Sequence, residues 1–148
     1  MPTPPAAPTA EQLPARTAAV WAALDPVVGA AAPLRVIDVG GGSGMFAVPL
    51  ARLGHDVTVV DPSADALATL RRRAETAGVG ARVHGIQGDG DLLAEALPGD
   101  EAAGYDLALC HYVLEVVDDP SATLRQIGGA VRSGGHVSVA TANRAGAV

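Results

Sequence analysis

Short apolar runs alternate along this chain with longer stretches in which apolar residues recur every three or four positions. The short runs predict buried strands, because apolar side chains on both faces are typical of central parallel strands. They occupy residues 34–39, 57–60, 82–87, 105–110 and 136–141. Strands that alternate with helices through short loops predict βαβ units with right-handed crossovers. The expected fold class is therefore α/β with a parallel sheet.

Helical spacing fills the stretches between the predicted strands. Residues 14–28 predict a first helix that Asp25-Pro26 ends or kinks. Leu50 lies on the apolar face of a second helix, which Pro49 is expected to bend by removing one hydrogen bond.

The later helices have recognisable ends. Pro62-Ser63 is expected to open one helix, and Asp119-Pro120 opens another that Ser133-Gly134-Gly135 ends. The Pro/Ala-rich residues 1–13 predict a disordered lead-in. A single domain is therefore expected over residues 14–148.

The segment at residues 36–45 stands out, because an apolar strand with one carboxylate, Asp38, stops in the turn Gly40-Gly41-Gly42-Ser43-Gly44. Glycine lacks a Cβ atom, so the backbone bends sharply in such a turn and a ligand approaches it closely. The first amides of the following helix have no partners within the helix and can receive an anionic group. The turn therefore predicts a site for a nucleotide-like cofactor.

Several chemically useful side chains share one position in the predicted sheet. In open parallel sheets, ligands bind beyond the carboxyl ends of the strands, where the strand order reverses. The residues at these predicted ends are Asp38, Asp61, Asp89, Cys110 and His111. Asp61 and Asp89 also fit simple turn positions, but their coincidence at successive strand ends favours a binding site.

Two cofactors fit a glycine turn after the first strand. Gly42, Gly44 and Ala47 match a dinucleotide fingerprint, with Asp61 near the distance expected for a ribose contact, which would make the chain an NAD(P)-binding oxidoreductase. Asp38 argues against that cofactor, because a carboxylate beside a pyrophosphate is repelled. A ligand with an ammonium and a sulfonium, such as S-adenosylmethionine, suits this carboxylate better.

The motifs together resemble those of the class I S-adenosylmethionine-dependent methyltransferases, from about residue 34 to residue 143. The resemblance rests on the glycine motif at residues 36–44, Asp61, Gly88-Asp89, the fourth-strand motif at 105–115 and Gly134-Gly135. It implies a Rossmann-like, doubly wound sheet of order 3-2-1-4-5, with S-adenosylmethionine as cofactor. The cofactor-binding residues expected from it are Asp38, Gly40, Gly41, Gly42, Gly44, Asp61, Pro62, Ser63, Gly88, Asp89, Gly90, Cys110 and His111.

The resemblance also raises an expectation about the end of the chain. The family's sheet has seven strands, and this sequence stops just after the fifth, so the last two strands are expected to be absent. Those strands help to form the acceptor pocket in the family. An uncovered apolar edge promotes association, and we therefore expect self-association through the fifth strand and weak activity of the chain alone.

Within the family, residues 110–120 and Asn143-Arg144 are similar to the corresponding segments of enzymes that methylate a carboxymethoxy group on a tRNA wobble uridine. The expected acceptor is either such a carboxylate or a small molecule. A carboxylate needs no base, whereas a hydroxyl or an amine does. His111 is the candidate catalytic base or acceptor-orienting group. A catalytically inactive cofactor-binding fragment remains an alternative.

Composition narrows the partners. The net charge of −6 argues against DNA as a partner and against broad binding to nucleic acid. The run Arg71-Arg72-Arg73 is either a local RNA contact or a solvated helix face. The single cysteine excludes an internal disulfide and favours a reducing cytoplasm. No apolar stretch is long enough for a membrane span. The histidines lack metal-ligand spacing, so no metal site is expected.

Overall fold

The computed structural model of the chain describes residues 15–29 and 33–142. The strands are β1 (Arg35–Val39), β2 (Asp56–Asp61), β3 (Val83–Gln87), β4 (Tyr105–His111) and β5 (Val131–Ala140). The α-helices are α1 (Ala15–Val28), α2 (Ala47–Arg52), α3 (Ala64–Thr76), α4 (Leu93–Ala96) and α5 (Pro120–Ala130). Short 3₁₀ turns lie at Gly80–Arg82, Gly90–Leu92 and Gly99–Ala102. The predicted lead-in at residues 1–13 and the pair Asn143-Arg144 lie outside the described residues.

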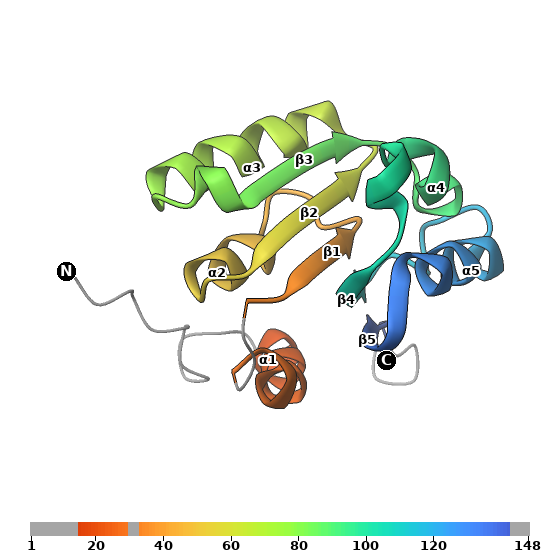
Figure 1. Ribbon diagram of the computed structural model, residues 1–148, viewed down its shortest axis with the longest axis horizontal. Coiled ribbons are helices and arrows are strands. Elements are labelled where there is room, and N and C mark those ends of the chain that lie inside the picture. The colour runs from red at the N-terminus through yellow and green to blue at the C-terminus, as the bar shows by residue number, and fades with distance from the viewer. Residues whose placement is uncertain (1–14, 30–32, 143–148) are drawn as a thin grey trace.

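The described strands form one parallel sheet in the order β3-β2-β1-β4-β5 (Figure 1). This order confirms the expected Rossmann-like α/β fold. At the centre, Asp38 of β1 pairs with Val59 of β2 on one side and with Leu109 of β4 on the other. The strand order reverses between β1 and β4, so the carboxyl ends of these two strands frame the expected ligand position.

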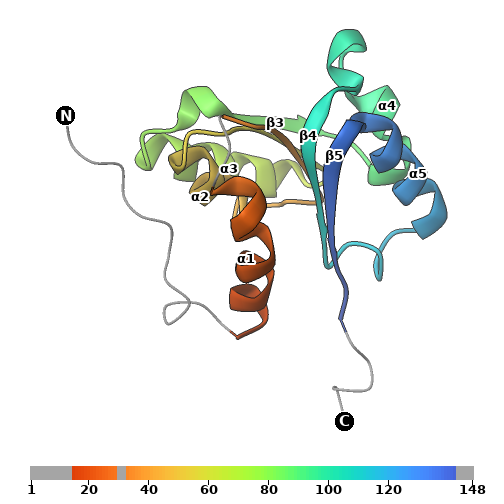
Figure 2. The same cartoon turned by 60° about the horizontal axis from the view of Figure 1, so that its bottom comes forward.

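Helices cover both faces of the sheet, as Figures 1 and 2 show. On one face, α1, α2 and α3 enclose a core that includes Val36, Leu50 and Leu70. On the other face, α4 and α5 enclose a second core that includes Ile37 and Ile127. Successive residues of a strand point to opposite faces, so Val36 and Ile37 belong to different cores. Because both faces are buried, the strands have the continuous apolar runs seen in the sequence.

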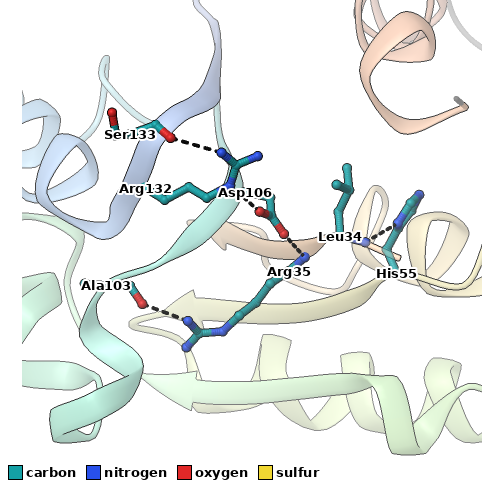
Figure 3. Close-up of polar contacts among 7 residues, drawn as sticks. All are labelled: Leu34, Arg35, His55, Ala103, Asp106, Arg132 and Ser133. Atoms are coloured by element: carbon teal, nitrogen blue, oxygen red, sulfur yellow. Dashed lines mark hydrogen bonds and ion pairs between the residues drawn. The ribbon is translucent and has the colours of Figure 1, made fainter. Parts of the chain in front are cut away.

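A polar cluster joins β1, β4 and β5 near their amino ends (Figure 3). The carboxylate of Asp106 on β4 accepts hydrogen bonds from the backbone amide of Arg35 at 2.8 Å and from Nε of Arg132 on β5. These two hydrogen bonds lower the pKa of Asp106, the one from Arg35 most. The Arg35 side chain donates to the carbonyl oxygen of Ala103 at 2.7 Å and lies over the ring of Tyr105. This cluster therefore ties the two halves of the sheet together at the edge away from the carboxyl ends.

His55 connects α1 to the start of β1. Its Nδ1 atom accepts from the amide of Leu34 at 2.9 Å (Figure 3), so the neutral ring carries its proton on Nε2. Nε2 donates to the carbonyl oxygen of Val28 at 3.0 Å. The side chain is only 2% exposed. His55 thus satisfies two backbone groups in the connection between α1 and the sheet.

Pro26 does not end its helix, and the kink there stays a prediction, whereas Pro49 removes one hydrogen bond from its helix. α1 continues through Pro26 and ends at Val28, so the proline costs at most one bond of the last turn. Pro49 is the third residue of α2, which begins at Ala47. The amide of Val48 donates to the carbonyl oxygen of Gly44 at 3.1 Å, and that of Leu50 donates to the carbonyl oxygen of Phe46 at 3.0 Å. Pro49 has no N–H group, so it leaves out the one bond between them, as predicted, and the bend stays a prediction.

The predicted boundary between α5 and β5 is also wrong. α5 ends at Ala130, and β5 begins at Val131, before the segment Ser133-Gly134-Gly135. Tyr105 of β4 pairs with Val131, whereas Leu107 pairs with His136, so the segment forms a bulge. Gly134 has a φ of +79°, and a Cβ atom on Gly135 would crowd the carbonyl oxygen of Asp106. The glycines therefore permit a β-bulge and do not end the helix.

β5 is the edge strand of the described sheet on that side. Val137 and Val139 on it are 45% and 46% exposed. Self-association through β5 stays a prediction, which sedimentation velocity can check. Within residues 15–29 and 33–142, no helix combines the length and the apolar character that a membrane span requires.

Candidate cofactor site at the carboxyl ends of the strands

The glycine turn after β1 is shaped by three residues with positive φ. Gly40, Gly42 and Gly44 have φ angles of +73°, +56° and +91°. Residues other than glycine adopt such backbone angles only with strain. The amide of Gly40 donates to the carbonyl oxygen of Val60 at 2.7 Å, so the turn begins directly against β2. A Cβ atom on Gly40 would collide with Val113, and one on Gly44 with a neighbouring side chain of α3. The turn therefore depends on glycine for its conformation and for its packing.

Asp61 at the end of β2 holds the glycine turn in place. Its Oδ2 atom accepts from the amide of Gly42 at 3.0 Å, and its Oδ1 atom accepts from the amide of Ser63 at 2.9 Å. Ser63 in turn caps α3 by accepting from the amide of Ala66 at 3.1 Å. A carboxylate oxygen accepts more than one hydrogen bond, so Asp61 can still receive ligand hydroxyls. Its predicted ribose contact stays a prediction.

Asp38 lies beneath the same turn. The side chain is 2% exposed, and Oδ2 has no hydrogen-bond partner among the described residues. A Cβ atom on Gly41 would overlap this carboxyl group, so Gly41 lies directly against it. Burial, and then the charge of Asp61, raise the pKa of Asp38 from 3.8 to about 7. An orphaned buried carboxyl of this kind favours a ligand that carries a positive charge.

A cavity of about 490 Å³ opens beside the turn. Five predicted residues line it, namely Gly40, Asp61, Pro62, Asp89 and Gly90. The other predicted residues do not line it: Asp38, Gly41, Gly42, Gly44, Ser63, Gly88, Cys110 and His111. Gly88 has a structural position, because its amide donates to the carbonyl oxygen of Asp61 at 3.2 Å and a Cβ atom there would collide with Ala96.

Apolar walls of this cavity were missed by the sequence reasoning. They come from Leu92 and from Val113, Val116 and Val117 in the loop after β4. Tyr112 has a φ of +60° and its amide donates to the carbonyl oxygen of Ala140, so the chain turns sharply there and brings Val113 against Gly40. Three valines close together after the predicted fourth strand, at positions 113, 116 and 117, are the sequence signal that could have identified this wall.

His111, at the end of β4, lies beside the ring of Phe46 and not in the wall of the cavity. The two rings meet edge to face at 4.6 Å, and Trp21 stacks on Phe46 at 5.1 Å. Nε2 of His111 is 2.8 Å from the hydroxyl of Ser138, while the buried Nδ1 atom has no partner among the described residues. Burial lowers the pKa of His111 from 6.5 to about 4, so the ring is neutral near pH 7. Its catalytic role stays a prediction.

Cys110 and Glu115 have structural positions in the described chain. The Cys110 side chain is fully buried, and burial, followed by the charges of Asp38 and Glu115, raises the pKa of its thiol to about 11. A thiol in that state is a poor nucleophile. The Glu115 carboxylate accepts from the amide of Ala142 at 2.9 Å. Among the described residues, no three His, Cys, Asp or Glu side chains are grouped so that they could hold a metal ion.

Comparison with known proteins assigns the family. A family model described as a methyltransferase domain matches residues 10–147 of the chain. The chain belongs to this methyltransferase family. It is 42% identical over 111 residues to the ubiquinone biosynthesis O-methyltransferase of Methylocella silvestris. It is 35% identical over 126 residues to the tRNA 5-carboxymethoxyuridine methyltransferase of Escherichia coli K12.

These alignments cover 75% and 84% of this methyltransferase chain, but 41% and 47% of the two relatives. The chain thus spans less than half the length of each. Among solved structures, an S-adenosylmethionine-dependent methyltransferase of Mesorhizobium loti matches with a TM-score of 0.66 and 31% identity, over 83% of this chain and 52% of that one.

A methyltransferase of Thiobacillus denitrificans, solved with S-adenosyl-L-homocysteine, matches with a TM-score of 0.64 and 27% identity, over 82% and 47% of the two chains. The expected membership in the class I S-adenosylmethionine-dependent methyltransferases is therefore confirmed. S-adenosylmethionine is the cofactor of this family.

The residues present here fit that cofactor. The orphaned oxygen of Asp38 suits a cationic group, and the carboxylates of Asp61 and Asp89 line the cavity, where they can accept hydrogen bonds from hydroxyl and amino groups. The apolar walls around Val113 and Leu92 suit a flat base. The family assignment and this donor set favour S-adenosylmethionine over the dinucleotide alternative.

Proposed function

We propose that this chain forms the cofactor-binding part of an enzyme that transfers a methyl group from S-adenosylmethionine to an oxygen atom of its acceptor. The observation that carries the proposal is the pair of carboxylates around one glycine turn. Asp61 holds the amide of Gly42, whereas Asp38 keeps an unpartnered oxygen beneath Gly41. A cation stabilises the charged form of Asp38, while a pyrophosphate would repel it.

The contributions of the chain to this reaction are alignment and exclusion of water. The bound cofactor supplies a methyl group activated by its positively charged sulfur. Asp61 and Asp89 orient the nucleoside part, and the buried Val113 and half-buried Val117 of the loop after β4 give the cavity an apolar wall that limits water there. Such alignment is the main requirement of an in-line displacement.

The proposed acceptor atom is an oxygen, of a carboxylate on a modified tRNA uridine or of a small molecule. The relatives support it, because they include an O-methyltransferase and a tRNA carboxymethoxyuridine methyltransferase. For a hydroxyl acceptor, His111 is the proposed group that takes the proton. Burial lowers its pKa to about 4, so this ring is neutral at physiological pH but is a weaker base than an ordinary histidine. We further propose a cytoplasmic setting, which the single buried cysteine supports and cell fractionation can check.

Thermal unfolding with added ligand tests the proposal. S-adenosyl-L-homocysteine at a hundredfold excess over its dissociation constant should stabilise the chain by about 2.7 kcal/mol. Asp61→Ala removes both the expected ribose contact and the bond to Gly42, so it should abolish this stabilisation. Asp56→Ala is the matched control, because Asp56 is an exposed carboxylate at the opposite end of the same strand. Stabilisation by NAD⁺ alone, or by neither ligand, would contradict the proposal.

A further inference from the structure

A groove of about 350 Å³ lies between α2 and α3, apart from the cofactor cavity. Three arginines line it: Arg52 on α2, and Arg72 and Arg73 on α3. The hydroxyls of Thr69 and Thr76 lie in the same lining, and no carboxylate does. The groove is thus a local concentration of positive charge on a chain whose net charge is −6.

The guanidinium groups of α3 are oriented without being neutralised. Arg72 donates to the hydroxyl of Thr69 at 3.2 Å, and Arg73 donates to the hydroxyl and the carbonyl oxygen of Ser43 at 3.2 and 3.3 Å. These partners are uncharged oxygens. The ion pairs found in the described part of the chain lie elsewhere. Because arginine stays protonated, three mutually repelling charges remain together and an anion between them would relieve that repulsion.

The geometry of the α3 arginines separates this groove from an ordinary solvated face. Consecutive helical residues point in different directions, and Arg71 lines another cavity together with Glu75. Arg72 and Arg73 instead line one groove together with Arg52 of the neighbouring helix. Planar guanidinium groups bind phosphate oxygens through paired hydrogen bonds, and threonine hydroxyls add further donors.

We infer that this groove binds the phosphate group of a small phosphorylated molecule. A small ligand is favoured over a nucleic-acid backbone, because nucleic acids are held through many phosphates on a broadly basic surface. This chain carries 16 acidic residues against 10 arginines. A single groove with three arginines is suited to one phosphate group.

Isothermal titration of the 148-residue chain with inorganic phosphate, at constant ionic strength set by chloride, tests the inference. Saturable binding is expected, with a dissociation constant on the order of 1 mM for so small a ligand. The double variant Arg52→Gln/Arg72→Gln keeps the hydrogen bonds from Arg73 to Ser43 in the glycine turn. It should bind phosphate at least about tenfold more weakly. Arg125→Gln, on the exposed surface of α5, is the matched control and should bind as the wild type does.

Equal thermal unfolding midpoints of the variants and the wild type establish that all are folded. Equal phosphate affinity in all of these proteins, or binding that does not saturate, would overturn the inference. A single-stranded RNA oligonucleotide serves as a second ligand. RNA binding that is far tighter than phosphate binding and is lost in the double variant would show that the groove binds nucleic acid and not a small ligand. No RNA binding supports the small ligand.

Discussion

Replacement of Asp38 by asparagine tests how a buried, unpartnered carboxyl group affects this fold. Its pKa is raised from 3.8 to about 7, first by burial and then by the charge of Asp61. The native state therefore binds this proton more tightly than the unfolded chain does, so the free energy of unfolding falls as the pH rises between the two values. The stabilising contribution is complete below pH 3.8 and is lost above about pH 7.

The magnitude follows from the two pKa values. A tenfold change in proton affinity corresponds to about 1.4 kcal/mol, so the interval from 3.8 to about 7 corresponds to about 4 kcal/mol. Between pH 5 and pH 8, about 3 kcal/mol of stability should be lost through this group. Asparagine does not titrate, so Asp38→Asn should lack this loss and gain stability relative to the wild type as the pH rises.

Urea unfolding of the cofactor-free wild type and of Asp38→Asn at pH 5, 6, 7 and 8 measures the effect. Other groups titrate in both proteins, so the difference between the two free energies of unfolding at each pH isolates Asp38. Parallel pH profiles would refute the reasoning. The same variant should bind S-adenosyl-L-homocysteine more weakly, because asparagine lacks the charge that attracts an amino cation. Unchanged affinity would mean that Asp38 does not face the ligand.

Two further predictions concern the histidines. His55→Leu leaves the amide of Leu34 and the carbonyl oxygen of Val28 without partners. It should therefore lower the free energy of unfolding by about 2–4 kcal/mol in urea titrations. His84→Leu, at an exposed histidine, is the control, and equal effects of the two substitutions would contradict the role of His55. With a hydroxyl acceptor, the acid limb of kcat should lie near pH 4 and not near 6.5, because burial lowers the pKa of His111. A limb near pH 6.5, or one unchanged in His111→Gln, would exclude His111 as the base.

The fold was predictable because its signals are local. Apolar runs and helical spacing are read within one element, and they located the strands of the sheet. The glycine turn and Asp38 are contiguous in the sequence, so their association required no knowledge of packing. Boundaries that depend on remote partners were missed. The bulge at Ser133-Gly134-Gly135 exists because β5 pairs with β4, so the helix end predicted there was wrong.

The candidate site was also predictable in part from local sequence and in part only from the packing of the chain. Sequence alone placed Asp38, Asp61 and Asp89 at the carboxyl ends of neighbouring strands, because strand ends in a parallel sheet share one edge. Only the tertiary structure decided that Asp61 binds the amide of Gly42, while an oxygen of Asp38 remains without a partner. It also placed His111 against Phe46 and away from the wall of the cavity.

The groove of Arg52, Arg72 and Arg73 shows why the rest could not be predicted. A run of three arginines is visible in the sequence, but Arg52 joins two of them only when α2 packs beside α3. Periodicity and turn chemistry are encoded by neighbouring residues, so the sequence by itself determined the elements and their succession along the chain, whereas the strand order 3-2-1-4-5 was implied by the resemblance to the family. The burial of an atom and the charges beside it depend on segments that are distant in the chain. Only the folded structure decided these two properties.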